Sequence, residues 1–128
     1  MRDIIFRGKR LDGKGWVESM TIAYGDIRRK KGIELLDIIK NEWVDVDPAT
    51  VGQYTGMKDK NGKKIFEGDI MSLVTEFGDT IIREIQFIDG TFCVIGERED
   101  DLYGLSWAIE KCDGIVGDNI HDNPDLLK

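Results

Sequence analysis

The sequence predicts a mostly β fold, of the barrel or sandwich type, and three observations lead to that prediction. Its 128 residues include 15 glycines, which divide the chain into short segments, and only 2 prolines. The segments between the glycines are rich in Ile, Val, Thr, Phe and Trp, the residue types that favour strands. Many short strands separated by turn residues are typical of β-barrels and β-sandwiches.

Length and composition fit an ordered protein of ordinary domain size. Apolar residues make up 41% and charged residues 34% of the chain, which argues against disorder. No apolar run approaches the roughly 20 residues that a membrane-spanning helix needs. The N-terminal segment MRDIIFRGKR lacks the apolar region of a secretory signal. We therefore expect a protein of the cytoplasm.

The first elements are predicted to form a β-hairpin. Residues 3–8, DIIFRG, lead through the turn LDGKG into the extended segment WVESMTIAYG at 16–25. Residues 26–48 fit two structures, because Leu35, Leu36 and Ile39 would share one face of a helix whereas EWVDV at 42–46 is typical of a strand. We favour strands here, with a turn at Gly32.

Two further hairpins are predicted in the second half of the chain. The segments DIMSLVTEF at 69–77 and TIIREIQFI at 80–88 are joined at Gly78-Asp79. The second of these strands then turns at Asp89-Gly90 into TFCVIG, and Asp-Gly is a preferred dipeptide of two-residue hairpin turns.

The C-terminal part is predicted to hold short helical turns around one strand. In LSWAIEKCDG, Ser106 suits the N-cap of one or two helical turns and Gly114 suits their end. GIVGDNI at 114–120 is a predicted strand, and Asn123-Pro124 suits the start of a terminal helical turn.

The segment VGQYTGMKDKNGKKIFEGDI, residues 51–70, concentrates turn residues and lysines. If Asn61 and Gly62 are the two central residues of a type I′ turn, Asp59 lies opposite Lys64. The two glycines beside Tyr54 suit a bent strand or a bulge, and Gly-Asp before IMSLV suits a tight turn. The residues assigned to backbone geometry are Gly52, Gly56, Asn61, Gly62, Gly68 and Asp69.

The longer segment VDPATVGQYTGMKDKNGKKIFEGDI resembles the signature of the YopX family, small proteins encoded mainly in bacteriophages and prophages. MRDIIFRGK and IVGDNIHDNPDLL resemble the two ends of that family, so the likeness spans the chain, although residues 26–42 and 75–105 match only in rough character. The resemblance implies an SH3-like barrel at about residues 48–120 and implies no established function or catalytic residues. We therefore divide the chain into an N-terminal β region, 1–47, packed on a barrel and tail, 48–128, as one compact unit.

The residues offer no strong catalytic or metal-binding pattern. Cys93, Cys112 and a single His121 are too few for a structural zinc site, and Cys93 in a strand is expected to be a buried, inert thiol. The run EREDD at 97–101 contains carboxylates for a hard cation or for acid–base chemistry, but such runs more often form solvated loops. We predict that the protein is not an enzyme and needs no metal or cofactor.

Charge is unevenly distributed along the chain. Residues 1–64 hold 14 Lys/Arg and 10 Asp/Glu, whereas residues 65–128 hold 4 and 15. This asymmetry indicates either a surface for a charged partner or attraction between the halves, within the fold or across an oligomer. We favour the second because the whole chain carries a charge of -7.

The sequence thus predicts a non-enzymatic phage or prophage accessory protein in the bacterial cytoplasm, which acts through protein contacts and self-associates. The alternative is a nucleic-acid-binding regulator whose basic turns contact phosphates while Tyr54 or Trp43 stacks on a base. The candidate interaction surface comprises Arg28, Arg29, Lys30, Lys31, Lys58, Lys60, Lys63, Lys64 and Tyr54. A hydrolase or metal-dependent enzyme that uses the acidic run is a third hypothesis.

Overall fold

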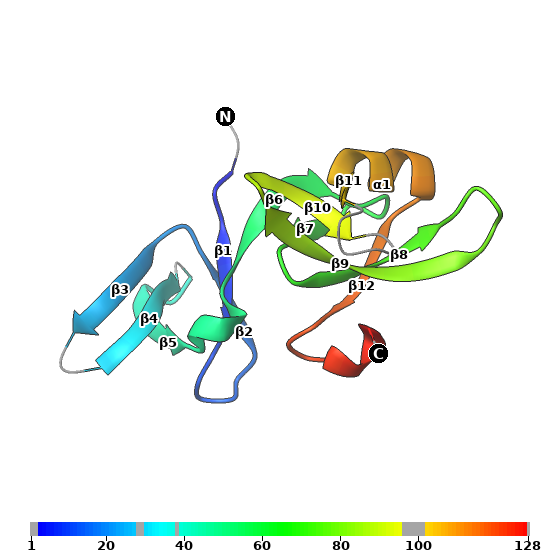
Figure 1. Cartoon of the computed structure of the whole chain (residues 1–128). Coiled ribbons are helices and arrows are strands. Elements are labelled where there is room, and N and C mark those ends of the chain that lie inside the picture. Colours follow the sequence, from blue (N-terminus) through cyan, green and yellow to red (C-terminus); the bar gives the residue numbers. More distant parts are fainter. Residues whose placement is uncertain (1–2, 28–29, 38, 96–101, 128) are drawn as a thin grey trace. The chain divides into compact units, whose positions relative to one another are not determined.

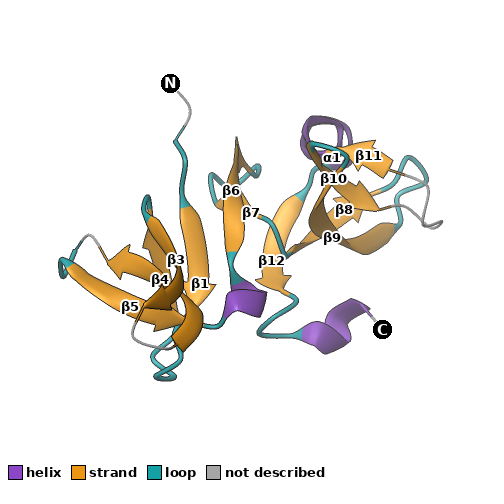
Figure 2. Ribbon diagram, turned by 60° about the vertical axis from the view of Figure 1, so that its left-hand side comes forward, coloured by secondary structure: helices purple, strands orange, loops and turns teal. Residues whose placement is uncertain are grey.

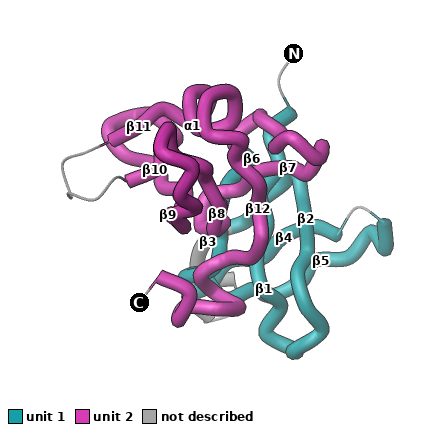
Figure 3. Tube along the Cα trace, turned by 90° about the vertical axis from the view of Figure 1, so that its right-hand side faces the viewer, with its two compact units in different colours: residues 1–54 teal, residues 55–128 magenta. Residues whose placement is uncertain are grey.

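The computed structural model describes residues 3–27, 30–37, 39–95 and 102–127 (Figure 1). The chain divides into two compact units, residues 1–54 and 55–128 (Figure 3). The boundary lies inside strand β6 (Gly52–Lys58). The division at residues 47 and 48 made from the sequence, with the first part packed on the second, stays a prediction, and each unit is described by itself.

Unit 1 is built from antiparallel strands (Figure 2). The predicted N-terminal hairpin is confirmed, because β1 pairs with β2 from Phe6↔Ser19 to Lys9↔Trp16. On its other side β1 pairs with the first residues of β6. The elements of the unit before β6 are β1 (Phe6–Lys9), β2 (Trp16–Ser19), β3 (Ile22–Ile27), β4 (Lys30–Asp37), β5 (Glu42–Val46) and the 3-10 helix η1 (Pro48–Thr50).

The segment at 16–25, predicted as one strand, is two strands. The Ser19 hydroxyl accepts a hydrogen bond from the Thr21 N–H at 3.0 Å and donates one to the Thr21 carbonyl at 2.8 Å. This local pairing of a serine side chain with the backbone replaces ladder bonds and breaks the strand after Ser19. β3 therefore leaves the hairpin and enters a second sheet.

Strands are confirmed for most of residues 26–46. β3, β4 and β5 form a three-stranded antiparallel sheet in chain order. Leu35 is fully buried and packs with Val17, Val44 and Val46, so apolar residues on alternate positions, not a helical face, form this core. The predicted turn at Gly32 is wrong, because Gly32 lies inside β4 opposite Gly25.

Among its described residues, unit 2 contains one five-stranded sheet and one α-helix. Its strands pair in the antiparallel order β11-β10-β9-β8-β12. Among the described residues the strands of the chain form separate antiparallel sheets and no closed barrel, so the mostly β fold is confirmed and the SH3-like barrel is not. After β6 the elements are β7 (Lys64–Phe66), β8 (Asp69–Val74), β9 (Thr80–Ile88), β10 (Thr91–Ile95), β11 (Leu102–Gly104), α1 (Leu105–Cys112), β12 (Ile115–Asn119) and the 3-10 helix η2 (Pro124–Leu127).

Both predicted hairpins of unit 2 are confirmed. The β8–β9 turn is closed by the Thr75 N–H, which donates to the Asp79 carbonyl at 2.8 Å. At the β9–β10 turn, Asp89 and Gly90 have φ angles of +52° and +79°, the two positive values that a type I′ turn requires. The local dipeptide therefore determines this turn.

Helix α1 packs on one face of the large sheet. Its buried residues, Leu105, Ala108, Ile109 and Cys112, recur at helical spacing and contact a core that includes Met71 and Ile85. The predicted N-cap at Ser106 is wrong, because the helix begins at Leu105 and Gly104 occupies the cap position. The strand at β12 and the terminal turn at Pro124 are confirmed. No helix in the described ranges is long and apolar enough to cross a membrane.

Candidate functional site

The lysine-rich turn of residues 59–63 is held by the carboxylate of Asp59. One carboxylate oxygen accepts the backbone N–H groups of Asn61 and Lys63, each at 2.9 Å. The other accepts the N–H of Val116 on β12 at 2.9 Å, from a position 57 residues further along the chain. Asp59 is only 6% exposed, so this side chain stabilises the fold and is not displayed to a partner.

The geometry differs from the predicted type I′ turn. Gly62 has a φ of +81°, but Asn61 does not have a positive φ, and Asp59 lies opposite Lys63 and not opposite Lys64. The Gly62 N–H donates to the Asp59 carbonyl at 3.0 Å, which closes a four-residue turn that needs only one left-handed residue. The predicted pairing of Asp59 with Lys64 is therefore wrong.

Burial and hydrogen bonding act in opposite directions on Asp59. Burial raises the pKa of the Asp59 carboxyl, but the three backbone N–H donors and the nearby Lys63 lower that pKa by more in total. The net pKa lies below its ordinary value. The carboxylate is therefore ionised throughout the neutral range.

The same turn carries an ion pair with the end of helix α1. The Lys60 ammonium lies 2.5 Å from the carboxylate of Asp113, the left-handed residue that ends the helix. Both side chains are largely exposed, so the pair contributes little to stability. It nevertheless places an acidic group next to one of the four lysines proposed to bind phosphates.

Gly68 and Asp69 form the predicted tight turn, which the structure confirms. Gly68 has a φ of +87°, and the Asp69 carboxylate accepts the Phe66 N–H at 2.7 Å. The Gly68 carbonyl accepts the Ile120 N–H at 3.0 Å, and Asp69 is paired with Asn119 on β12. Gly56 also has a positive φ, of +85°, inside strand β6, as expected for a bent strand.

The other predicted surface residues lie in different surroundings. Arg28 and Arg29 are outside the described residues, and Lys30 and Lys31 belong to β4 of unit 1. Tyr54 is only 5% exposed, so its ring is not available to stack on a base, whereas Trp43 is 48% exposed. The proposal that these basic residues form one surface stays a prediction.

The residues considered for chemistry are mostly inaccessible. Cys93 and Cys112 are buried, and burial, followed by the nearby Asp89 or Asp113, raises the pKa of each thiol above its ordinary value. A raised pKa lowers the thiolate fraction and with it the reactivity. The acidic run at 97–101 lies outside the described residues, and the described ones contain no group of His, Cys, Asp and Glu side chains suited to a metal.

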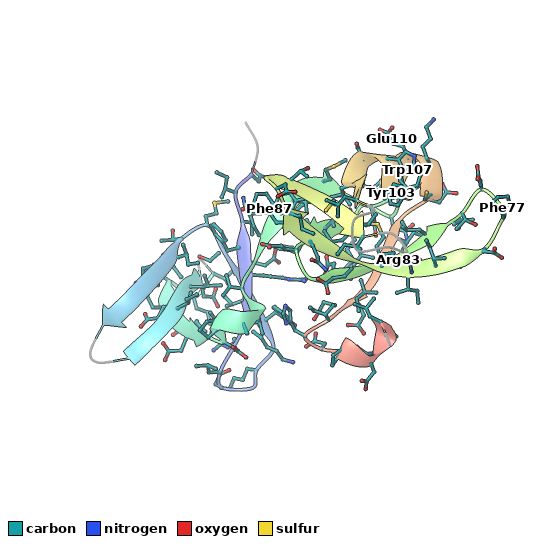
Figure 4. The ribbon with its side chains drawn as sticks, viewed as in Figure 1. Phe77, Arg83, Phe87, Tyr103, Trp107 and Glu110 are labelled. Carbon is teal, nitrogen blue, oxygen red and sulfur yellow. The ribbon has the colours of Figure 1, made fainter. Side chains whose placement is uncertain are left out.

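A groove that the sequence did not predict lies in unit 2, between the β8–β9 hairpin and helix α1. Its volume is 690 Å³, and residues from β8 to α1 line it. Tyr103 on β11 and Trp107 on α1 stack with ring centroids 4.9 Å apart, and they are 41% and 44% exposed (Figure 4). Its lining includes Leu73, Phe77, Ile81, Arg83, Tyr103 and Trp107, and we call it the aromatic groove.

Arg83 is the unusual residue of the aromatic groove. It lies on β9 between Ile81 and Ile85 at alternate positions, and Ile85 is fully buried, so Arg83 occupies the face that carries the core. One guanidinium nitrogen donates to the Ile82 carbonyl at 2.8 Å. The Nε atom is buried and has no hydrogen-bond partner among the described residues.

Two features of the sequence, neither of them used above, correspond to this groove. An arginine interrupts the apolar alternation of TIIREIQFI, and a tryptophan lies off the apolar face of LSWAIEKC. Neither feature identifies a groove by itself, because the groove forms only where helix α1 packs on the sheet that contains β9.

The comparisons with known proteins give the family. The YopX protein family profile matches residues 5–128. The chain belongs to the YopX family. Among solved structures, protein EF1440 from Enterococcus faecalis is 25% identical with a TM-score of 0.60, and yopX from Bacillus subtilis is 19% identical with a TM-score of 0.62, each match covering 100% of both chains. No curated protein matches the chain.

In this YopX-family chain, Asp59 and Asp69 both lie where their segment contacts β12. The Asp59 carboxylate accepts the Val116 N–H, and Asp69 is paired with Asn119 in the sheet. Residues 59–69 and β12 therefore contact each other in the fold. Neither aspartate lines the aromatic groove.

Proposed function

We propose that this YopX-family protein is a non-enzymatic accessory protein of phages or prophages that acts in the bacterial cytoplasm through protein contacts, with the aromatic groove as its contact surface. The observation that carries the proposal is the stacked, half-exposed pair of Tyr103 and Trp107 beside a cavity. Tyr and Trp are enriched where proteins bind one another, because they bury a large area with little loss of side-chain freedom. The SH3-like arrangement implied by the family resemblance belongs to the same proposal.

Self-association is part of the proposal, and charge supports it less than the sequence suggested. With the boundary after residue 54, unit 1 holds 10 Lys/Arg and 9 Asp/Glu, net +1, and unit 2 holds 8 and 16, net -8. The lysine-rich turn belongs to the acidic unit 2, so unit 1 is nearly neutral. The two units therefore do not carry strongly opposite charges. Self-association must therefore rely on apolar contact as well as on charge.

Light scattering at low and high salt tests self-association. We expect a mass above that of the 14.5 kDa monomer at both salt concentrations, because apolar contacts are not screened by salt. Trp107→Ala and Trp43→Ala, which remove similarly exposed tryptophans from unit 2 and from unit 1, test whether either unit provides the self-contact through its tryptophan. A monomeric mass of the unmodified protein at every concentration and salt tested would remove self-association from the proposal.

Nucleic-acid binding is the second candidate, and the rigid lysine-rich turn favours it. Lys58, Lys60 and Lys63 are exposed around a turn that is fixed by Asp59. If they contact phosphates, affinity for a DNA or RNA oligonucleotide falls steeply as salt rises, since each contact releases counterions. The acidic character of unit 2 opposes such binding.

Fluorescence anisotropy with a labelled oligonucleotide tests this candidate. Replacing Lys58, Lys60, Lys63 and Lys64 with alanine is expected to reduce affinity at least about tenfold and to flatten the salt dependence. Lys14→Ala, which changes an exposed lysine of unit 1, is the control. Absence of binding at low salt would exclude this function.

A further inference from the structure

We propose that the aromatic groove binds an extended, positively charged segment of another protein. In this arrangement an apolar side chain of the segment fills the cavity, a backbone carbonyl accepts a hydrogen bond from Arg83, and a Lys or Arg side chain lies on the exposed face of Trp107. The inference rests on the proposed function and specifies the chemistry of the partner.

Arg83 indicates that the groove is completed by a hydrogen-bond acceptor. A guanidinium on the core face of β9 loses much of its hydration, and the Nε atom gains no partner from the described residues in return. Buried polar atoms in proteins are nearly always hydrogen-bonded, so the unpaired Nε marks the guanidinium of Arg83, a residue that lines the groove, as one whose hydrogen bonds the described residues do not complete. The acceptor can be neutral, and every peptide segment carries backbone carbonyls in a row.

Tyr103 and Trp107 provide the surface for the side chains of the segment. They stack at an interplanar angle of 23°, so each ring covers one face of the other and the two form a single aromatic stack that lines the groove (Figure 4). Phe77 in the β8–β9 turn is 83% exposed and also lines the groove. An aliphatic side chain of the segment would bury apolar area between Phe77 and the Tyr103–Trp107 stack. A cation would interact with the face of the Trp107 indole that Tyr103 leaves uncovered.

Charge complementarity favours a basic segment over an acidic one. Glu76 and Asp79 are exposed residues that line the groove, and Glu110 lies three residues after Trp107 on the same side of helix α1. The positive groups of the groove are Arg83 and Lys111, so the lining alone is balanced. The charge of -8 on the whole unit then attracts a basic partner and repels an acidic one.

Three labelled peptides of about ten residues test the proposal by fluorescence anisotropy against the full chain. They share one framework of leucine and proline, which keeps them extended, and carry arginine, glutamine or glutamate at the same positions. We expect the arginine peptide to bind at least about tenfold more tightly than the glutamine peptide, and the glutamate peptide not to bind. Equal or tighter binding of the glutamate peptide, or no binding of any peptide, would overturn the proposal.

Variants of the protein test whether the peptide binds in the aromatic groove. Trp107→Ala is expected to weaken arginine-peptide binding at least about tenfold, whereas Trp43→Ala in unit 1 and Phe87→Ala on β9 leave it unchanged. Thermal unfolding of each variant verifies that it is folded. Loss of affinity that is equal in Trp107→Ala and Trp43→Ala contradicts binding in the groove.

Arg83→Met distinguishes two effects that Arg83 can have on the arginine peptide. Arg83 can donate a hydrogen bond to the peptide, or it can repel the peptide through its positive charge. Methionine keeps the apolar stem and removes the donor, so binding of the arginine peptide is expected to weaken several-fold. Tighter binding of that peptide by Arg83→Met means that Arg83 only repels it, which contradicts the carbonyl contact.

The same variants distinguish failure of this inference from failure of the proposed function. If no peptide binds but Trp107→Ala converts an oligomer into a monomer, the occupant is a second copy of this chain, and the basic segment is excluded while a protein-contact role stands. If Trp107→Ala changes neither peptide binding nor mass, the groove is not a contact surface and both proposals fail.

Discussion

Asp59→Ala is expected to lower the free energy of unfolding of unit 2 by about 2–4 kcal/mol, because three backbone N–H groups lose their acceptor at once. Water can replace the carboxylate at Asn61 and Lys63, which are exposed, but Val116 is buried, so most of the loss comes from its N–H. Urea denaturation followed by circular dichroism at neutral pH measures the change. A loss below about 0.5 kcal/mol would contradict the structural role of Asp59.

Asp59→Asn tests the contribution of the charge, and its effect depends on pH. The folded pKa of Asp59 is lower than the unfolded one, so the ionised carboxylate stabilises the fold fully above the unfolded pKa. This stabilisation is lost as the pH falls through the folded pKa. The stability difference between the unmodified protein and Asp59→Asn is therefore constant near neutral pH and shrinks in acid below about pH 4. Asp89→Asn, at an exposed left-handed turn position that asparagine also accepts, is the matched control.

Gly114→Ala is expected to destabilise unit 2 by about 2–3 kcal/mol through overpacking. A Cβ atom at Gly114 would lie 2.6 Å from the sulfur of Met71 and 3.1 Å from the carbonyl oxygen of Ala108. Met71 is fully buried and the carbonyl accepts the Gly114 N–H at the end of α1, so neither neighbour moves away easily. The same urea denaturation measures this change.

Gly117→Ala is the control for Gly114→Ala. Gly117 lies three residues further along, on β12, and a Cβ atom there would meet nothing within 4 Å. We expect a change within about 0.5 kcal/mol, typical of an open position. Equal destabilisation by both substitutions would mean that loss of glycine itself, and not the contact with Met71, is responsible.

The two Asx-Gly turns show how far the sequence determines this fold. Asp89-Gly90 joins two strands, β9 and β10, that pair with each other directly, and it forms the type I′ turn that the dipeptide predicts. Asn61-Gly62 does not, because Asp59 accepts the N–H groups of the turn with one oxygen and the distant Val116 N–H with the other. Contacts far apart in sequence override local preference at the second turn, and no local pattern reveals them.

The candidate site was missed for a related physical reason. The lysines of residues 58–64 are adjacent in sequence and therefore conspicuous, whereas Arg83, Tyr103 and Trp107 come from three elements. Only the packing of α1 on the sheet brings these three side chains to the lining of one groove. The alternation of β9 and the helical period of α1 can be read from the sequence. The sequence does not show that these two elements pack together.

The pairing of β12 with β8 has a consequence for synthesis of the chain. Strand β8 (Asp69–Val74) pairs on one edge with β12 (Ile115–Asn119). During synthesis this edge of β8 therefore stays unpaired until more than forty further residues have been added. Unpaired strand edges are prone to join other chains, and contacts between distant residues form slowly. Nascent unit 2 is therefore most exposed to aggregation just before its last strand emerges, and a chaperone that shields a β edge would act in that interval.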